Sequence, residues 1–343
     1  FIGTLSNKNS SMCPFFADGR YERLDNTAST LEFKTLMKHS SGIPSKIENE
    51  GFVVFRDRDG KFVQYKIIIA EEDRTSRQLY VLAVGSWIEL TKEMIEPFEN
   101  VKLSAKQQLD YFLRNTRWQA GQVVYNGVRT MSSDKMMTVL EATQRLRAAF
   151  RLEPRFRIEI GVNGEITRRY CDLLERRGIV HPNRFEIGKD VQLLRRKIDT
   201  TELVTALFGY GQQEEGANVD APLDFSGVQW SKANGDPVNK PLGQKWVGSD
   251  EALAKYGGKD KKHKFGVHES QVQGDAASLL QHTWEVLQRR STPKVTYEVD
   301  LAVLGDVGIG DTINIVDQKD DDNELYLEAR VLELEGPVSE DKK

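Results

Sequence analysis

Two short turns constrain this sequence more than any other feature, because each carries the residues that a tight β-hairpin requires. Val162-Asn163-Gly164-Glu165 separates an alternating apolar run from a strand that begins at Ile166. Arg56-Asp57-Arg58-Asp59-Gly60 separates the apolar run over residues 52–55 from a second run over residues 61–70. Asn-Gly and Asp-Gly tolerate the positive φ that such turns need. The sequence therefore predicts antiparallel pairing of neighbouring strands and a β-rich fold.

The first 90 residues carry further strand patterns and few helix signals. Apolar and polar residues alternate, as in a half-buried strand, at Leu31, Phe33, Thr35 and Met37. The apolar run over residues 79–84 predicts another strand. Several strands joined by short turns are typical of a barrel or sandwich, and we expect residues 1–90 to form a first small β-barrel domain.

The middle of the chain combines helix and strand patterns. Ser104 is suited to cap a helix over residues 105–115, because its hydroxyl can accept from free backbone amides in the first turn. A second helix is predicted from Ser133 or Asp134 to Phe150. The hairpin around Asn163-Gly164 follows, so residues 91–184 are expected to form an α+β module.

The last part of the chain is again rich in strand patterns. Strands are predicted over residues 184–188, 205–211, 295–303, 312–316 and 325–334. Between them lie a helix over residues 276–290 and, before it, a long segment over residues 212–275 without regular pattern. A segment of that kind is uncommon inside a compact domain unless it is functional or an insertion. We expect residues 185–343 to form a second β-barrel domain with a loop-rich insertion over about residues 212–290.

The fold class is therefore a mixed, β-rich α+β chain in which two small, similar β-barrels enclose an α+β module. Its 343 residues are enough for two or three domains, with 29% charged and 39% hydrophobic residues as in a soluble globular protein. The net charge of -4 favours neither nucleic acid nor membrane. The apolar run Ile67-Ile68-Ile69-Ala70 is far shorter than the roughly 20 residues of a spanning helix, so no membrane insertion is expected.

The amino-terminal residues lack the pattern of a secretory signal, so we expect synthesis in a cytosol. Only Cys13 and Cys171 carry thiols, far apart in sequence and without metal-ligand spacing. Two thiols in a chain of this length are typical of a reducing compartment and not of a disulfide framework.

No motif for catalysis or metal binding is found. The five histidines, none of them at metal-ligand spacing, are His39, His181, His263, His268 and His282. The densest set, Lys262-His263-Lys264 with His268-Glu269, is interpreted as a solvated loop. Gly305–Gly310 lacks the Lys-Ser or Lys-Thr of a phosphate-binding loop. We therefore predict no catalytic residue, no cofactor-binding residue, no metal ligand and no cofactor.

An acidic run could imitate a calcium loop, at Asp317, Asp320, Asp321, Asp322, Asn323 and Glu324. It lacks the central Gly, the late Glu and the flanking helices of an EF-hand. The alternative, which we favour, is a solvated hairpin tip whose charge discourages edge-to-edge strand pairing.

Residues 142–197 hold fourteen Lys or Arg against seven Asp or Glu, whereas residues 317–343 hold ten acids against four bases. The basic segment could contact a phosphate backbone. It could also be a charged, exposed module, or pair with acidic segments of a neighbouring subunit. Aromatic residues are sparse there, namely Phe150, Phe156, Tyr170 and Phe185, so a surface for stacking single-stranded bases is poorly supported. We favour the exposed module or the pairing between subunits over contact with a phosphate backbone.

The run from Lys189 to Gly211, KDVQLLRRKIDTTELVTALFGYG, resembles the prophage tail endopeptidase family, and in particular tail proteins of Listeria-type prophages. Trp230, Gly235-Asp236-Pro237, Lys240-Pro241 and Trp246-Val247 resemble the family's insertion. The late helix around Trp284 and the strands around Tyr297–Leu301 and Gly310–Ile313 are similar to its closing part. The resemblance extends from about residue 30 to residue 335.

This resemblance implies a siphophage tail-associated hub that is similar to contractile-phage baseplate hubs. It implies two barrels per subunit with α+β insertions, assembled as a homotrimer, so that six similar positions meet a six-fold tail tube. The implied partners are distal-tail or tail-tube proteins and receptor-binding or baseplate proteins, with DNA only passing through the channel. The implied location is the virion tail, assembled in the bacterial cytoplasm.

Two other functions stay open. The family name includes endopeptidase, so a cell-wall hydrolase or peptidase acting in host entry is one alternative; because no further domain follows Lys343 here, we expect no enzyme activity. A receptor-binding or carbohydrate-binding module that uses Trp230 and Trp246 is the other alternative, although Trp in loops more often packs internally.

Overall fold

The structure is a computed structural model that describes Leu5 and residues 12–125, 127–212, 222–273, 275–302, 305–317 and 325–338. The chain divides into two compact units: unit 1 comprises residues 1–192 and 301–343, and unit 2 comprises residues 193–300. Unit 2 is therefore an insertion in the sequence of unit 1. Among the described residues, no helix is long and apolar enough to cross a membrane.

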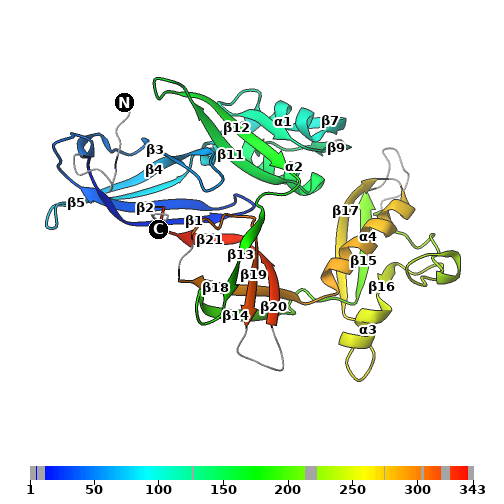
Figure 1. Ribbon diagram of the computed structural model, residues 1–343. Coiled ribbons are helices and arrows are strands. Elements are labelled where there is room, and N and C mark those ends of the chain that lie inside the picture. Colours follow the sequence, from blue (N-terminus) through cyan, green and yellow to red (C-terminus); the bar gives the residue numbers. More distant parts are fainter. Residues whose placement is uncertain are drawn as a thin grey trace. The chain divides into compact units, whose positions relative to one another are not determined.

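Unit 1 is built on a nine-stranded sheet with the order β21-β1-β2-β5-β4-β11-β12-β8, while β3 pairs with β4 beside this path (Figure 1). Its strands are β1 Phe15–Arg23, β2 Ser29–Leu36, β3 Phe52–Arg56, β4 Phe62–Asp73, β5 Gln78–Gly85, β8 Gln119–Val123, β11 Glu153–Ile160, β12 Ile166–Leu174 and β21 Glu333–Gly336. All pairs are antiparallel except β12 with β8.

Both turns that dominate the sequence close hairpins, as predicted. Asp57 donates its amide to the carbonyl of Lys61 at 2.7 Å, and Gly60 lies at φ 78° between β3 and β4. Gly161 donates to the carbonyl of Glu165 at 2.8 Å, and Gly164 lies at φ 80° between β11 and β12. A residue with a Cβ is strained at such φ values, so glycine is the residue that lets both turns close.

Two pairings join segments that are far apart in sequence. β11 joins β4 through Ile158 opposite Phe62, so the expected first domain and the expected α+β module share one sheet. β21 pairs with β1 through Arg20–Arg23 opposite Glu333–Gly336. The segment 325–334, expected to be one strand, is in fact β20 Leu325–Arg330 followed by β21. The split occurs because β20 pairs with β19 (Thr312–Asp317) and β21 with β1.

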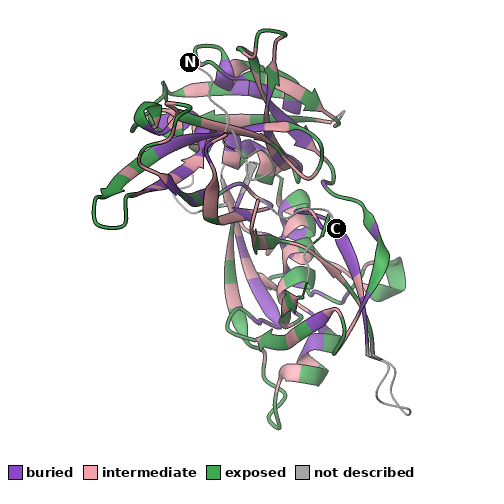
Figure 2. Ribbon diagram, turned by 60° about the vertical axis from the view of Figure 1, so that its left-hand side comes forward, coloured by how far each residue is buried: buried purple, intermediate pink, exposed green. Residues whose placement is uncertain are grey.

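Two helices cover part of the sheet and enclose the largest core. α1 Ala105–Leu113 begins with a capping box in which Ser104 and Gln107 satisfy each other's backbone amides. α2 spans Val139–Phe150 and is capped by Thr138. Figure 2 shows buried and exposed residues alternating along the strands. The helices pack on the buried face of the sheet. They contribute Leu109, Phe112, Leu146 and Phe150 to this core, and the sheet contributes Phe156, Cys171 and Leu173.

The expected start of the second helix at residue 133 or 134 was wrong. That segment is occupied by β9 Val128–Ser133 and β10 Met137–Thr138, which pair with β7 Phe98–Ser104 and β6 Met94–Ile95. Pairing with distant strands therefore overrides the local helical pattern until Thr138 supplies a cap. The short 3-10 helices are η1 Pro44–Lys46, η2 Ser86–Thr91 and η3 Lys232–Asn234.

The remaining strands form small sheets. β13 Val180–Glu186 pairs in parallel with β19, which pairs with β20, and β14 Val191–Asp199 pairs with β18 Lys294–Leu301. Unit 1 has a further apolar cluster on the face of β2, β4 and β5, around Leu31, Tyr65 and Val81. A β-rich α+β architecture is thus confirmed. In the described residues the strand order of the nine-stranded sheet stays open between β21 and β8, so two closed barrels, and the similarity of the two, stay predictions.

Unit 2 contains more regular structure than its composition indicates. The segment 212–275, expected to be irregular, includes β16 Trp246–Gly248, α3 Asp250–Tyr256 and β17 Phe265–Gln273. The strands β16 and β17 pair with β15 Ala206–Gln212 in a three-stranded sheet of the order β16-β15-β17. The helix α4 Ala276–Arg290 packs on this sheet. The bounds of α4 are those predicted. The separate core of unit 2 includes Leu207, Phe225, Val247, Leu279, Leu280 and Leu287.

Because unit 2 has a core of its own, Leu279→Ala should destabilise it selectively. Leu279 is fully buried, and truncation of a buried Leu costs about 2–5 kcal/mol through lost transfer free energy and a residual cavity. Amide hydrogen exchange should show weakened protection in residues 193–300 and unchanged protection in β1–β5. Leu109→Ala in unit 1 is the matched control and should give the reverse pattern. Equal loss of protection in both units after Leu279→Ala would contradict two separate cores.

Candidate functional site

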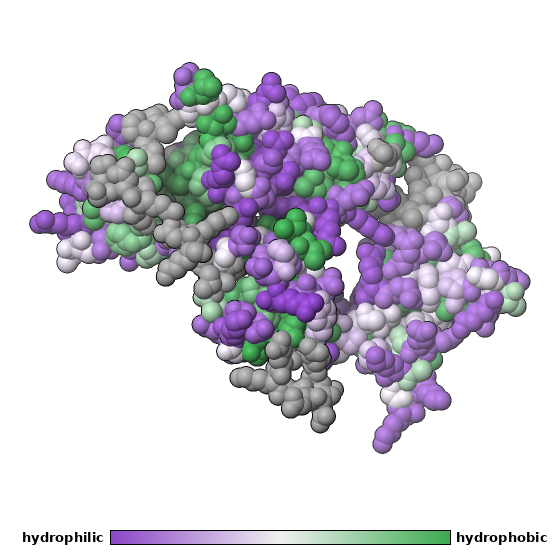
Figure 3. Space-filling view, in the orientation of Figure 1, coloured by the Kyte–Doolittle hydropathy of each residue, from purple (hydrophilic) through white to green (hydrophobic). Residues whose placement is uncertain are grey.

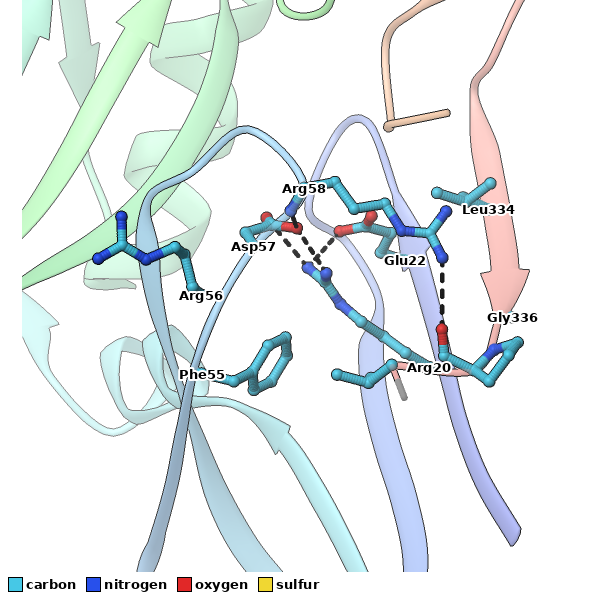
Figure 4. Close-up of a pocket in the computed structure, with 10 residues that line it drawn as sticks. Arg20, Glu22, Phe55, Arg56, Asp57, Arg58, Leu334 and Gly336 are labelled. Carbon is cyan, nitrogen blue, oxygen red and sulfur yellow. Dashed lines mark hydrogen bonds and ion pairs between the residues drawn. The ribbon is translucent and has the colours of Figure 1, made fainter. Parts of the chain in front are cut away.

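A small charged pocket lies where β1, the β3–β4 turn and β21 meet (Figure 4). Its cavity has a volume of about 40 Å³ and is lined by Arg20, Glu22, Phe55, Arg56, Asp57, Arg58, Leu334, Gly336, Pro337 and Val338. Residues two apart on a strand point to the same face, so β1 presents Arg20 and Glu22 side by side. The hairpin turn brings Asp57 to the same place.

Arg20 is the centre of this pocket. Its Nη1 donates to Asp57 Oδ1 at 2.7 Å, its Nη2 to Glu22 Oε2 at 2.5 Å and its Nε to the Tyr65 hydroxyl at 2.8 Å. The guanidinium carbon also lies 5.2 Å from the centre of the Phe55 ring, within the range of a cation–π contact. All three nitrogens of the guanidinium thus donate a hydrogen bond.

Burial and pairing act in opposite directions on the pocket's carboxylates. Burial alone would raise the pKa of Asp57, but the charge and hydrogen bond of Arg20 lower it overall. Burial dominates for Glu22, whose pKa is raised although Arg20 lies beside it. Arg20 keeps a raised pKa against its own burial because Tyr65, Glu22 and Asp57 surround it. The pocket therefore holds a permanent cation with one firmly ionised partner, Asp57.

The lining residues include no thiol, hydroxyl or imidazole, and the cavity has room for little more than a water molecule. Arg58 extends from the same turn and donates to the carbonyls of Val307, at 2.7 Å, and Pro337, at 3.3 Å. The pocket is therefore suited to hold the two ends of unit 1 together and not to bind and transform a substrate. The pocket was not predicted, because charged residues at alternate positions 18, 20 and 22 of one strand signal only the part of it that β1 contributes.

A second buried ion cluster lies on β11 and β12. The carboxylate of Asp172, whose side chain is fully buried, accepts from Arg155 and Arg157, both at 2.8 Å, and from the Gln122 amide at 2.8 Å. Although burial acts to raise the pKa of Asp172, these hydrogen bonds lower it overall. Arg155 also reaches Asp59 of the β3–β4 turn at 3.3 Å. This turn thus connects both charged clusters.

These pairs bear on the basic segment 142–197. Several of its bases are neutralised inside unit 1, since Arg155 and Arg157 pair with Asp172, and Arg145 pairs with Glu141. Arg177 is buried and donates to the carbonyl of Pro154. A charged module, one of the two favoured interpretations, agrees with these contacts better than a free phosphate-binding surface does. Of the acidic segment 317–343, residues 318–324 and 339–343 lie outside the described residues, and so does the calcium-like run beyond Asp317.

A larger groove of about 920 Å³ lies on the face of unit 1 around β3. Its walls are mainly apolar and come from β1–β4, the loop before β3 and the tip of the β11–β12 hairpin, for example Leu31, Phe33, Phe52, Ile67, Ile160 and Ile166. Figure 3 shows hydrophobic side chains gathered in a hollow in this region. The groove has the size of a binding site but only a few polar groups.

The structure separates the histidines. His181 contacts Asp306 at 3.2 Å, His39 contacts Ser41, and His263 contacts Thr205 at 2.9 Å. Only His268 and His282 meet, at 3.3 Å between ring nitrogens. Within the part of the chain that the structure describes, no three His, Cys, Asp or Glu side chains are placed to hold a metal ion.

The two thiols are free and buried, at Cys13 and Cys171. Burial raises the pKa of the Cys171 thiol far above its ordinary value, so little reactive thiolate forms at neutral pH. Gly310, in the glycine run after residue 305, lies at φ 86° and serves a turn before β19. Trp230 packs edge to face on Trp284, 6.3 Å between ring centres, whereas Trp246 lies on a sheet face with His263 and Phe265.

Asp172→Asn should lower the free energy of unfolding by about 3 kcal/mol at pH 7, because it leaves two arginines without their buried partner. A carboxylate with a lowered folded pKa stabilises the protein above its unfolded pKa, and this contribution is lost as pH falls through the folded pKa. The difference between variant and wild type should therefore shrink below about pH 4. Denaturant titrations from pH 3 to pH 8 measure it. Asp110→Asn, which breaks the exposed pair with Lys106, should cost no more than about 0.5 kcal/mol. A difference that does not change with pH would contradict this role.

The family model described as prophage endopeptidase tail matches residues 181–343. No protein with a curated description matches the sequence. Prophage tail protein gp18 from Listeria monocytogenes EGD-e is similar over 93% of this chain and 83% of its own, at 13% identity and a TM-score of 0.55.

Two other solved structures share the fold to a similar extent. The tail protein from Neisseria meningitidis MC58 is 10% identical and covers 93% of this chain and 86% of its own, with a TM-score of 0.58. The 43 kDa tail protein of prophage MuSo2 from Shewanella oneidensis is 10% identical and covers 93% and 88%, with a TM-score of 0.55. Residues 181–343 thus match the prophage endopeptidase tail family model, and the chain shares the fold of prophage tail proteins over nearly its whole length.

Proposed function

We propose that this chain is a structural subunit of a phage tail hub, joining the tail tube to the host-attachment apparatus. The observation that carries the proposal is the family match over residues 181–343. The parts of that region that belong to unit 1, residues 181–192 and 301–343, pack with the rest of unit 1. β21 completes the sheet beside β1, and Arg330 forms two hydrogen bonds to the Glu153 carboxylate on β11, at 2.6 and 2.7 Å. An assembly role for residues 181–343 therefore involves the whole of unit 1.

In the proposed assembly three copies form a ring with a channel through which DNA passes. Tail-tube or distal-tail proteins bind on one side, and receptor-binding or baseplate proteins on the other, after assembly in the bacterial cytoplasm. A closed ring needs two different surfaces on each subunit, so that one surface meets the other on the next copy. The basic segment 142–197 and the acidic segment 317–343 offer opposite charges for such a contact.

We infer a mechanical role without catalysis. The charged pocket has no thiol, hydroxyl or imidazole among its lining residues, and its carboxylates Glu22 and Asp57 are bonded to Arg20. The thiols are buried, and the large groove is mainly apolar. Catalysis requires a nucleophile, a general acid–base group or a metal placed beside a substrate site. The family name contains endopeptidase, so hydrolysis is the competing function.

Hydrolysis is tested directly with the purified chain. Zymograms that contain peptidoglycan or casein should show no clearing, because the carboxylates of the charged pocket are bonded to Arg20 and its cavity has room for little more than a water molecule. The control is a cell-wall hydrolase and a protease run in the same gels. Clearing by this chain that survives repurification would contradict the mechanical role.

Assembly is tested on intact tails and in solution. Imaging of tails with antibody-labelled chain should place three copies in a ring at the tail tip. Absence from the tail, or a two-fold or six-fold arrangement of this protein, would contradict the hub.

In solution, light scattering should show a trimer fraction that rises with protein concentration and falls with added salt, since screening weakens contacts between opposite charges. Trimers that resist 1 M salt would contradict an electrostatic contact.

A further inference from the structure

The strand β3 (Phe52–Arg56) lies at an edge of the main sheet of unit 1. Lys66 of β4 pairs with Phe52 on one side and with Val84 of β5 on the other, so β3 and β5 occupy opposite edges of β4 (Figure 1). Among the described residues β3 pairs with β4 alone. The second edge of β3, which we call its free edge, is therefore open to an additional strand.

The hydrogen bonds around β3 show which backbone groups point to the free edge. The amide of Asp57 donates to the carbonyl of Lys61 at 2.7 Å, and the amide of Ile67 donates to the carbonyl of Gly51 at 2.8 Å. In an antiparallel pair such bonds recur at every second residue, so residues 53 and 55 bond to β4. The amides and carbonyls of residues 52 and 54 point the other way, and no other described group bonds to them there.

The large apolar groove of unit 1 encloses this free edge. Val53 and Phe55 pack on the apolar cluster around Tyr65, so Phe52 and Val54 point to the opposite face of the strand. All four of these residues line the groove. Because the groove contacts both faces of β3 and β4 covers one edge, the groove extends around the free edge. The outward amides and carbonyls therefore face into it.

The chemistry of the groove selects the class of ligand. Backbone amides and carbonyls that alternate along an edge match the groups that another extended polypeptide presents. A nucleic acid strand needs basic groups along its path, and the lining residues include one base, Lys46, against Asp18 and Glu48. A lipid chain would fit the apolar walls but would leave the backbone groups of β3 without partners. The acidic excess favours a polypeptide with a basic flank.

The size of the groove favours a single segment over a folded face. Five residues at about 3.3 Å each give the free edge a length of about 16 Å. This is too short for the roughly 800 Å² per partner that a stable interface between folded proteins buries. The volume of about 920 Å³ is instead that of a ligand site. Strands that are covered on both faces are apolar along their length, so the segment should be a continuous apolar run.

We propose that the free edge of β3 binds an extended apolar segment of a partner protein, which adds one strand beside β3 and fills the groove. Backbone hydrogen bonds to Phe52 and Val54 hold the segment, and the apolar walls select its side chains. The inference rests on unit 1 alone and does not depend on the hub function.

A probe peptide tests whether the contact uses the backbone. The full chain is titrated against fluorescein-labelled GKVTVFVKG, and binding is measured by fluorescence anisotropy. A second form of the peptide carries an N-methyl group on every amide of the apolar run, so it keeps the side chains but cannot donate from its backbone. The methylated form should bind at least about tenfold more weakly, since it loses two or three hydrogen bonds. A purely apolar contact would keep its affinity.

A proline on β3 tests the free edge from the other side. Val54→Pro removes the amide that points into the groove and leaves the bonds of residues 53 and 55 to β4 in place, as an edge strand allows. It should weaken binding of the probe about tenfold. The matched control, Val54→Ala, shortens the same side chain but keeps the amide, and should weaken binding by no more than about threefold. Thermal melting verifies that both variants are folded.

A substitution in the wall provides a variant that leaves the backbone of β3 unchanged. Phe52 is 39% exposed, so Phe52→Ser should not disturb folding. It should weaken binding about fivefold, because it removes apolar contact area from the groove. Val128→Ser, at a residue of β9 that is 55% exposed, is the matched control and should change nothing.

Four results would overturn the inference. The first is no binding of the probe at about 1 mM, the weakest affinity expected of a specific contact. The second is equal binding of the methylated and unmethylated peptides, which would assign the groove to an apolar ligand without backbone pairing. The third is equal binding by Val54→Pro and Val54→Ala when both melt like the wild type. The fourth is a dimer of the wild-type chain that Val54→Pro dissociates, which would assign the free edge to a second copy.

Discussion

The buried guanidinium of Arg20 is the group about which unit 1 is organised. It lies on β1, which pairs with the last strand, β21, and it bonds to Asp57 in the β3–β4 turn and to Tyr65 on β4. Removing a charge from water is costly unless other charges and hydrogen bonds replace the water, and here they come from three separate elements. The strands β1 and β4 and the β3–β4 turn must therefore be in place together. Because β1 also pairs with β21, the early strands are coupled to the last described strand.

The hairpins and several helix bounds could be predicted from the sequence because their causes are local. Asn163-Gly164 and Asp59-Gly60 carry the turn chemistry, and Ser104 carries the cap of α1. The pairing of β21 with β1 and of β11 with β4 could not be predicted, because a strand pattern specifies which face is buried but not which distant strand is the neighbour. For the same reason a helix was expected where β9 and β10 find their partners.

The candidate sites show the same division. Trp246 was visible in the sequence, but only the sheet of unit 2 places it beside His263 and Phe265. Trp230 looked equivalent in sequence and in fact packs on Trp284. The charged pocket was missed because its members come from residues near 20, 57 and 337, and no spacing rule links them.

The chain enters unit 2 through β14 and leaves it through β18, and these two strands pair with each other. The two points of entry and exit are therefore neighbours, and the described strands of the nine-stranded sheet, including the pair β1 and β21, all come from unit 1. An insertion attached by one paired ribbon behaves as an exchangeable cassette, since another domain with adjacent ends can occupy the same place without disturbing the host sheet. Changes in unit 2 can therefore alter what this chain contacts while the pairing of β1 with β21 in unit 1 stays in place.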